Sequence, residues 1–131
     1  MATPEKKRVR VLLVDDHELT RLSLRLALSS HVEVTGSACN GKEALEMVRV
    51  QNPDVVVLDL QMPMMDGFSA SSQIKDLCPA VKILAYSSLN DQKTEGVEQV
   101  STFDAFCNKD TSTIDLVNLI QALGKPTDSL K

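Results

Sequence analysis

The sequence predicts an α/β domain in which helices cover both faces of a doubly wound sheet of five parallel strands, forming three layers. Segments of strand length and segments of helix length alternate along almost the whole chain. Residues 11–14, 55–58 and 83–84 are continuous aliphatic runs, which are typical of strands buried on both faces. Strands that alternate with helices pair in parallel through right-handed crossovers.

The strand segments are rich in β-branched residues, and turn residues bound them. The first is the sequence RVRVLLV, whose end is fully apolar, and the third is DVVVLD, which closes on an acid. The five predicted strands span residues 8–14, 32–38, 54–59, 81–87 and 104–108.

The helix segments have start and stop signals at their ends. Asn52-Pro53 closes the second helix, Pro79 follows the third, and the last begins at Thr111 or Ser112 and stops at Gly124. The predicted helices span residues 18–28, 41–51, 67–78, 91–100 and 111–123. Gly96 weakens the fourth, because an interior glycine costs about 1 kcal/mol relative to alanine.

The first helix has more apolar residues than one docked face requires. Leu24 and Leu28 share one side with Thr20 and Ala27, whereas Leu22 and Leu26 point almost opposite. The two surplus leucines form an interface for a partner or a homodimer, lie half-buried against the last helix, or are scattered exposed leucines.

Length and charge limit the classes of function. At 131 residues the chain is expected to form one domain, with an N-terminal arm at 1–7 and a tail or linker start at 124–131. The net charge of −4 argues against direct binding of nucleic acid. No apolar run is long enough for a membrane span or a signal peptide. Three unpaired cysteines favour a cytoplasmic protein with free thiols.

Polar residues follow the predicted strands where these end. Asp15 and Asp16 follow the first strand, and Asp59 ends the third. Ser87 and Ser88 lie at the end of the fourth, and Lys109 follows the fifth. The carboxyl ends of parallel strands share one edge of the sheet, where such folds bind their ligands.

Three carboxylates at one edge require a cation, because like charges at close range cannot all stay ionised. Mg²⁺ is a hard ion that prefers oxygen ligands. One aspartate would then be free to act as a nucleophile, and the lysine could neutralise a transferring phosphoryl group.

Four ordered motifs, LLVDDHELTR, VVVLDLQMPMMDG, ILAYSS and AFCNKD, resemble the receiver domain of two-component response regulators. The resemblance covers residues 8–123 and is strongest to the receivers of NarL/LuxR-type regulators. It implies a flavodoxin-like strand order of 2-1-3-4-5 and a signalling role rather than that of an enzyme. The implied partners are a sensor histidine kinase and a C-terminal DNA-binding domain that these residues do not include.

The resemblance also implies a role for each motif residue. Asp59 would be the phosphoacceptor, and Mg²⁺ would bind Asp15, Asp16, Asp59 and the backbone carbonyl of Gln61. Lys109 would pair with Asp59 and then with the phosphoryl group. Ser87 would donate its hydroxyl to that group, and Phe106 resembles the aromatic switch residue of the family.

The rival functions lack their motifs. A haloacid dehalogenase-type phosphatase needs D-x-D-x-T/V after the first strand, and neither glycine-rich nucleotide-binding motif is present. Acidic residues after the first strand would repel the phosphate of a flavin cofactor. Within the receiver family two alternatives stay open: a receiver cut inside a linker, or a stand-alone receiver that acts by protein contact or phosphorelay.

Three positions depart from the receiver pattern, and a fourth leaves a question. Asp110 follows Lys109 where most receivers have a proline after a cis bond, and Thr102 and Phe103 replace a small Gly-Ala pair. A metal ligand and a relay histidine are two alternatives for His17. The sequence predicts instead that it is an exposed residue at the start of a helix.

Overall fold

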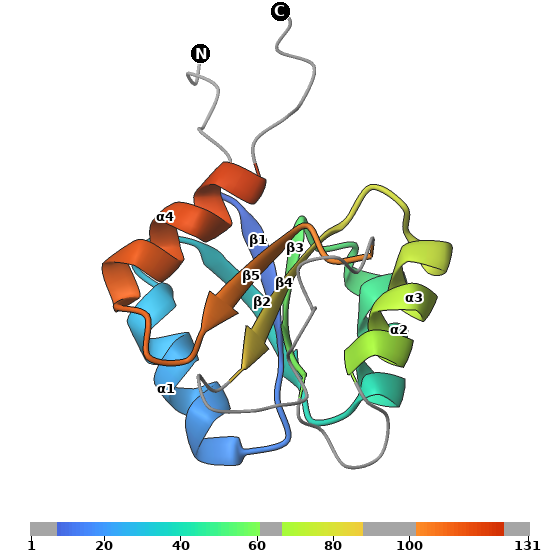
Figure 1. Cartoon of the computed structure of the whole chain (residues 1–131), viewed down its shortest axis with the longest axis horizontal. Coiled ribbons are helices and arrows are strands. Elements are labelled where there is room, and N and C mark those ends of the chain that lie inside the picture. The colour runs from blue at the N-terminus through green and yellow to red at the C-terminus, as the bar shows by residue number, and fades with distance from the viewer. Residues whose placement is uncertain (1–7, 61–66, 88–101, 125–131) are drawn as a thin grey trace, which may run out of the picture.

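The computed structural model describes residues 8–60, 67–87 and 102–124. Its five-stranded sheet has the order β2-β1-β3-β4-β5, and every neighbouring pair is parallel (Figure 1). The strands are β1 (Arg10–Val14), β2 (Glu33–Ala38), β3 (Val55–Asp59), β4 (Lys82–Ser87) and β5 (Ala105–Asn108). The predicted strand order is therefore confirmed, and each predicted strand is found with ends within two residues.

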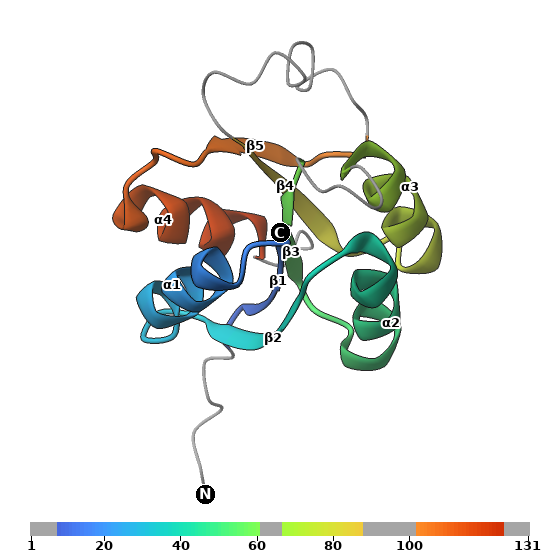
Figure 2. The same ribbon diagram turned by 90° about the horizontal axis from the view of Figure 1, so that it is seen from below.

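Helices pack on both faces of the sheet, which confirms the three layers. They are α1 (Glu18–Leu28), α2 (Gly41–Gln51), α3 (Gly67–Leu77) and α4 (Thr113–Leu123). Figure 2 shows α1 and α4 on one face and α2 and α3 on the other. The helix predicted at 91–100, with its Gly96, lies outside the described residues.

Alternate residues of the central strands supply two separate cores. Val11 and Leu13 of β1 join the core beneath α1 and α4, whereas Leu12 and Val14 join the core beneath α2 and α3. Successive strand side chains point to opposite faces, so an uninterrupted aliphatic run can fill both cores. This is why these strands do not alternate between apolar and polar residues.

Side-chain caps explain where two of the helices, α2 and α4, begin. Asn40 caps α2 by accepting a hydrogen bond from the Glu43 N–H, and Glu43 Oε1 accepts one from the N–H of Cys39, the residue before the cap. Ser112, not Thr111, caps α4. The N-cap of α1 is His17, whose side chain makes no capping hydrogen bond.

Phe103 and Asp104, just before β5, contact both the sheet and the layer formed by α2 and α3. Phe103 packs against the second core and against Leu60 and Ala85. Asp104 Oδ2 accepts hydrogen bonds from the Ile83 N–H at 2.8 Å and lies 2.8 Å from Lys75 Nζ. The contacts of Phe103 and Asp104 fix the start of the strand that delivers Lys109.

The described backbone contains no cis peptide bond, so the Lys109–Asp110 bond is trans.

The described helices include none with the length and apolar character needed to cross a membrane. The three cysteines are free, with Cys107 buried and the other two partly buried.

The two faces of α1 lie as the sequence predicts. Leu24 and Leu28 are in the core, and Leu22 and Leu26 are exposed, as is Leu19. Whether the exposed leucines form an interface stays a prediction.

Two leucines of this helix, Leu28 and Leu26, provide a matched test of its buried face. Leu28 is 0% exposed and Leu26 is 72% exposed. We expect Leu28→Ala to lower the free energy of unfolding by about 2–5 kcal/mol, because it leaves a cavity. Leu26→Ala should change it by no more than about 0.5 kcal/mol. Urea denaturation followed by circular dichroism measures both, and equal losses would contradict the assignment of faces.

Candidate functional site

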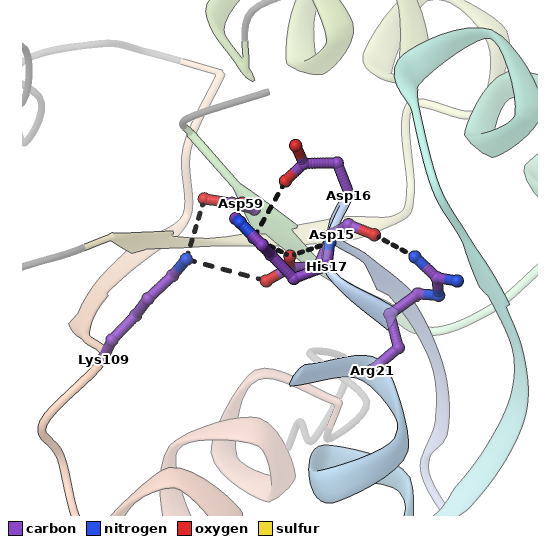
Figure 3. A network of polar contacts seen from close by, with 6 residues as sticks. All are labelled: Asp15, Asp16, His17, Arg21, Asp59 and Lys109. Carbon is purple, nitrogen blue, oxygen red and sulfur yellow. Dashed lines mark hydrogen bonds and ion pairs between the residues drawn. The ribbon is translucent and has the colours of Figure 1, made fainter. Parts of the chain in front are cut away.

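Four strand ends place polar side chains at one edge of the sheet. Asp15 follows β1, Asp59 is the last residue of β3, Ser87 is the last residue of β4, and Lys109 follows β5. The parallel registers put Asp59 beside Tyr86 and Ser87 beside Asn108. Figure 3 shows Asp15, Asp16, His17, Asp59 and Lys109 drawn together at this edge.

Lys109 connects two buried carboxylates. Its Nζ lies 3.3 Å from Asp59 Oδ1 and 3.6 Å from Asp15 Oδ2 (Figure 3). Asp59 is 0% exposed and Asp15 is 1% exposed. A buried carboxylate is costly without a counter-charge, and Lys109 supplies one. The Lys109 N–H also donates to the Ser87 carbonyl at 2.8 Å, which fixes the base of this side chain against β4.

Backbone hydrogen bonds hold the loop between β1 and α1. The His17 N–H donates to Asp15 Oδ1 at 2.8 Å. Arg21 reaches back from the first turn of α1 and donates from Nη1 to the Asp15 carbonyl at 2.7 Å. The position of Asp15 is therefore set from its side chain and from its backbone.

The acidic residues have the features of a cation site. Asp15 Oδ2 and Asp16 Oδ1 are buried oxygens with no hydrogen-bond partner among the described residues. One ligand atom from each of Asp15, Asp16, His17 and Asp59 can be chosen so that all four lie within 4.8 Å of one another. Lys109 carries one positive charge, whereas the three carboxylates carry three negative charges. The oxygens and the charge deficit both fit a divalent cation such as Mg²⁺.

The remaining predicted site residues lie in different places. Ser87 is buried at the end of β4, beside the acidic residues. Phe106 is exposed on β5, where it pairs in register with Ala85. Gln61 and Ser88 lie outside the described residues, so their predicted positions are not tested.

Sequence analysis missed two residues of the site, Tyr86 and Arg21. Tyr86 is 8% exposed, and Lys109 Nζ lies 5.6 Å from the centre of its ring. The only available signal was an aromatic residue next to the end of a buried strand. Arg21 had no signal, because its role depends on the loop folding back toward the first turn of α1.

Burial raises the pKa of Tyr86 to about 12, and two kinds of negative charge add to the effect: that of the Cys107 thiolate, which forms only at alkaline pH, and those of Asp15, Asp59 and Asp110. The pKa of the Cys107 thiol is also raised, mainly by burial. Both groups stay neutral at pH 7 and add no further negative charge near the carboxylates.

The elevated pKa predicts an alkaline loss of stability. Tyr86 is the only tyrosine, and the chain has no tryptophan, so absorbance near 295 nm follows this one residue. We expect ionisation near pH 12 in the folded protein and near the ordinary value of 10.0 in urea. Because the folded pKa is the higher one, the contribution of Tyr86 is fully present below pH 10 and is lost as the pH rises toward 12. Identical titrations in buffer and in urea would contradict this environment.

Comparison with known proteins places the chain in a family. Residues 11–121 match the family model of the response regulator receiver domain. The chain is 35% identical over 115 residues to the response regulator protein VraR of Staphylococcus aureus strain Mu3, an alignment that covers 86% of this chain and 55% of VraR. The chain thus spans about half the length of the curated relatives it matches.

Solved structures agree with this assignment. The signal receiver domain of the putative response regulator NarL from Mycobacterium tuberculosis is 30% identical with a TM-score of 0.80, covering 90% of this chain and 97% of that one. The response regulator domain of Thermotoga maritima CheB is 27% identical with a TM-score of 0.79, covering 92% and 100%. The chain therefore belongs to the response regulator receiver domains of two-component systems.

Proposed function

We propose that the chain is a phosphoryl-accepting signalling switch, in which Asp59 receives a phosphoryl group from a sensor histidine kinase in a Mg²⁺-dependent reaction. One observation carries the proposal: the Asp59 carboxylate is fully buried at the end of β3, yet lies 3.3 Å from Lys109 Nζ and beside two further acids. A buried acid among like charges contributes little to stability, but it suits charge-dependent chemistry.

The carboxylates of Asp15, Asp16 and Asp59 would hold the Mg²⁺. Their donor set is oxygen, and two of the oxygens, Asp15 Oδ2 and Asp16 Oδ1, are buried with no hydrogen-bond partner within the described ranges. By resemblance to the family, the Gln61 carbonyl completes the protein ligands, although it lies outside the described residues. When bound, Mg²⁺ would neutralise the negative charge that builds up as a phosphoryl group meets the acids.

The side chains of the domain would then act in a single displacement. A carboxylate oxygen of Asp59 attacks phosphorus, a bond from oxygen to phosphorus forms, and the bond from phosphorus to the kinase histidine nitrogen breaks. Lys109 neutralises charge on the transferring group, and the Ser87 hydroxyl donates a hydrogen bond to it. The domain thus assists its own phosphorylation rather than converting a separate substrate. In its dephosphorylation, water attacks phosphorus, the bond from phosphorus to the Asp59 oxygen breaks, and inorganic phosphate leaves with the Asp59 carboxylate restored.

Phosphorylation would change the contacts that Lys109 makes. A phosphoryl group on Asp59 would compete with the carboxylate oxygens for the lysine, and Ser87 would turn toward the new oxygens. Phe106 lies on the strand next to Ser87 and is exposed, so it can report this change on the surface. A local change in charge that shifts one packed element is a common switching device.

The output of the switch depends on the full-length protein. The chain covers about half of VraR, and a two-component response regulator of the LuxR family from Aurantimonas is 26% identical with a TM-score of 0.80. These relatives support a C-terminal DNA-binding domain and regulation of transcription, with no direct nucleic-acid contact by the receiver itself. The alternative is a stand-alone receiver that acts by protein contact or phosphorelay. The exposed leucines of α1 are the surface that would serve a homodimer or the kinase.

Replacement of the phosphoacceptor tests the central step. We expect Asp59→Asn to abolish phosphoryl incorporation from acetyl phosphate, because the amide lacks the nucleophilic carboxylate. The fold should be retained, since the side chain keeps its shape and one buried charge is removed. Intact-protein mass spectrometry measures incorporation, with Asp76→Asn, an exposed aspartate of α3, as the matched control. A phosphorylated Asp59→Asn protein would show that another residue is the acceptor.

Metal binding provides a second test that needs no phosphoryl donor. A ligand that binds only the folded state stabilises it by about 1.4 kcal/mol at roughly ten times its Kd. This should raise the melting temperature by roughly 3–6 °C. Asp16→Ala should remove the Mg²⁺-dependent shift, whereas Asp76→Ala should keep it. A melting temperature that does not respond to millimolar Mg²⁺ would contradict the proposed metal site.

A further inference from the structure

The imidazole of His17 belongs to the acidic cluster but has no part in the function proposed above. Its Nδ1 lies 3.3 Å from Asp15 Oδ1 and 3.1 Å from Asp16 Oδ1. Figure 3 shows the ring lying among the carboxylates. The sequence predicts an exposed histidine at a helix start, and its side chain is indeed 67% exposed. Its ring nitrogen nevertheless faces the acids.

The local backbone explains why the ring takes this direction. His17 is the N-cap of α1, a position where a side chain commonly accepts a hydrogen bond from the first turn, yet it makes no side-chain cap. Its N–H is held by Asp15 Oδ1, and the adjoining Asp15 carbonyl is held by Arg21. The residue is thus fixed at its backbone, and its ring is left free to meet the carboxylates.

The spacing of these atoms matches neighbouring ligands around one metal ion. Metal–nitrogen and metal–oxygen bonds of about 2.1 Å place adjacent ligands about 3.0–3.4 Å apart in octahedral or tetrahedral shells. The two nitrogen–oxygen distances, 3.1 and 3.3 Å, fall in this range. One ligand atom each from Asp15, Asp16, His17 and Asp59 lies within the same 4.8 Å cluster.

A hydrogen bond donated by Nδ1 of His17 accounts for fewer of these contacts than a bound cation does. Nδ1 carries at most one hydrogen, and only its contact with Asp15 Oδ1 has the geometry of a hydrogen bond. Asp16 Oδ1 is left buried with no hydrogen-bond partner among the described residues, as is Asp15 Oδ2 on the nearly fully buried Asp15 side chain. A cation bound between the ring and the carboxylates would use these oxygens together with the nitrogen.

We propose that His17 is a direct ligand that lets the acidic cluster bind a first-row transition-metal dication, of the class of Zn²⁺ or Co²⁺, in competition with Mg²⁺. The inference rests on the proposed function, because the same carboxylates hold both ions. Mg²⁺ prefers oxygen and is bound without the ring, whereas Zn²⁺ and Co²⁺ accept imidazole readily. His17 therefore sets which ion occupies the site rather than whether the site binds an ion at all.

The choice of ion would affect the signalling state. A transition-metal ion held by the ring and the acids occupies the position that Mg²⁺ needs beside Asp59. Cellular availability of such an ion would then be sensed at the phosphorylation site itself, without a second binding site.

Co²⁺ is a suitable probe, because its visible absorption spectrum changes when a nitrogen ligand binds. The spectrum also distinguishes oxygen or nitrogen ligands from thiolate ligands. The chain has two histidines, so His31→Gln, at an exposed position, is a matched control for His17→Gln. We expect His17→Gln to weaken Co²⁺ binding about tenfold or more. Its affinity for Mg²⁺ should change by less than about twofold, since Mg²⁺ does not depend on imidazole. His31→Gln should resemble the parent, and Mg²⁺ should displace Co²⁺ from both.

Calorimetric titration of the reduced 131-residue chain distinguishes a failure of this inference from a failure of the proposed function. If Mg²⁺ binds and Asp16→Ala removes that binding, but His17→Gln leaves Co²⁺ affinity unchanged, His17 is not a ligand and the proposed function stands. If neither ion binds the parent, the metal site of the proposed function is wrong, and this inference with it. Co²⁺ that Mg²⁺ cannot displace, or that His31→Gln weakens equally, is bound elsewhere and overturns the inference.

Discussion

The contact of Lys109 with the carboxylates of Asp59 and Asp15 is the interaction on which the site depends. Both acids are buried at the ends of adjacent strands, where their repulsion would otherwise favour an open edge. The ammonium group of Lys109 lies near both carboxylates and offsets this repulsion, so both acids can stay buried at the ends of their strands. Because Lys109 follows the edge strand β5, its position depends on the Phe103 and Asp104 contacts that anchor the start of that strand. The acidic pair and the far edge of the sheet are therefore linked through one side chain.

One lysine leaves the charge of the site unbalanced, and this imbalance connects stability with function. Three carboxylates lie at this edge, and Lys109 is near only those of Asp59 and Asp15. Asp15 Oδ2 and Asp16 Oδ1 are buried and have no hydrogen-bond partner in the part of the chain that the structure describes. Such a cluster costs stability in the free protein, and it gains stability when a cation binds. The same imbalance makes the site respond to a new charge, because the lysine can be drawn from a carboxylate to a phosphoryl group. The apolar strands beneath hold the edge rigid while this exchange takes place.

The loop from β1 to α1 has a larger part in the site than its acids alone suggest. Arg21 and the His17 N–H fix Asp15 from two directions, and the His17 ring lies beside both acids. The helix gives up a side-chain cap at this end, whereas α2 and α4 keep theirs. A capping interaction contributes about 1 kcal/mol, so its absence is a small stability cost at the point where the ring meets the acids.

The sequence by itself determined the strand positions, the three layers and the group of acids. Aliphatic runs, helix start and stop signals and strand ends are local patterns that can be recognised directly in the order of the residues. It also separated Leu28 from Leu26 by helical period, and the structure confirms both faces. Tertiary structure alone decided what Phe103 contacts, that Arg21 supports Asp15, that Tyr86 lies under Lys109, and that His17 turns toward the acids instead of capping its helix. Each of these depends on the direction of a side chain across a loop or between strands distant in sequence, and no periodicity records that direction.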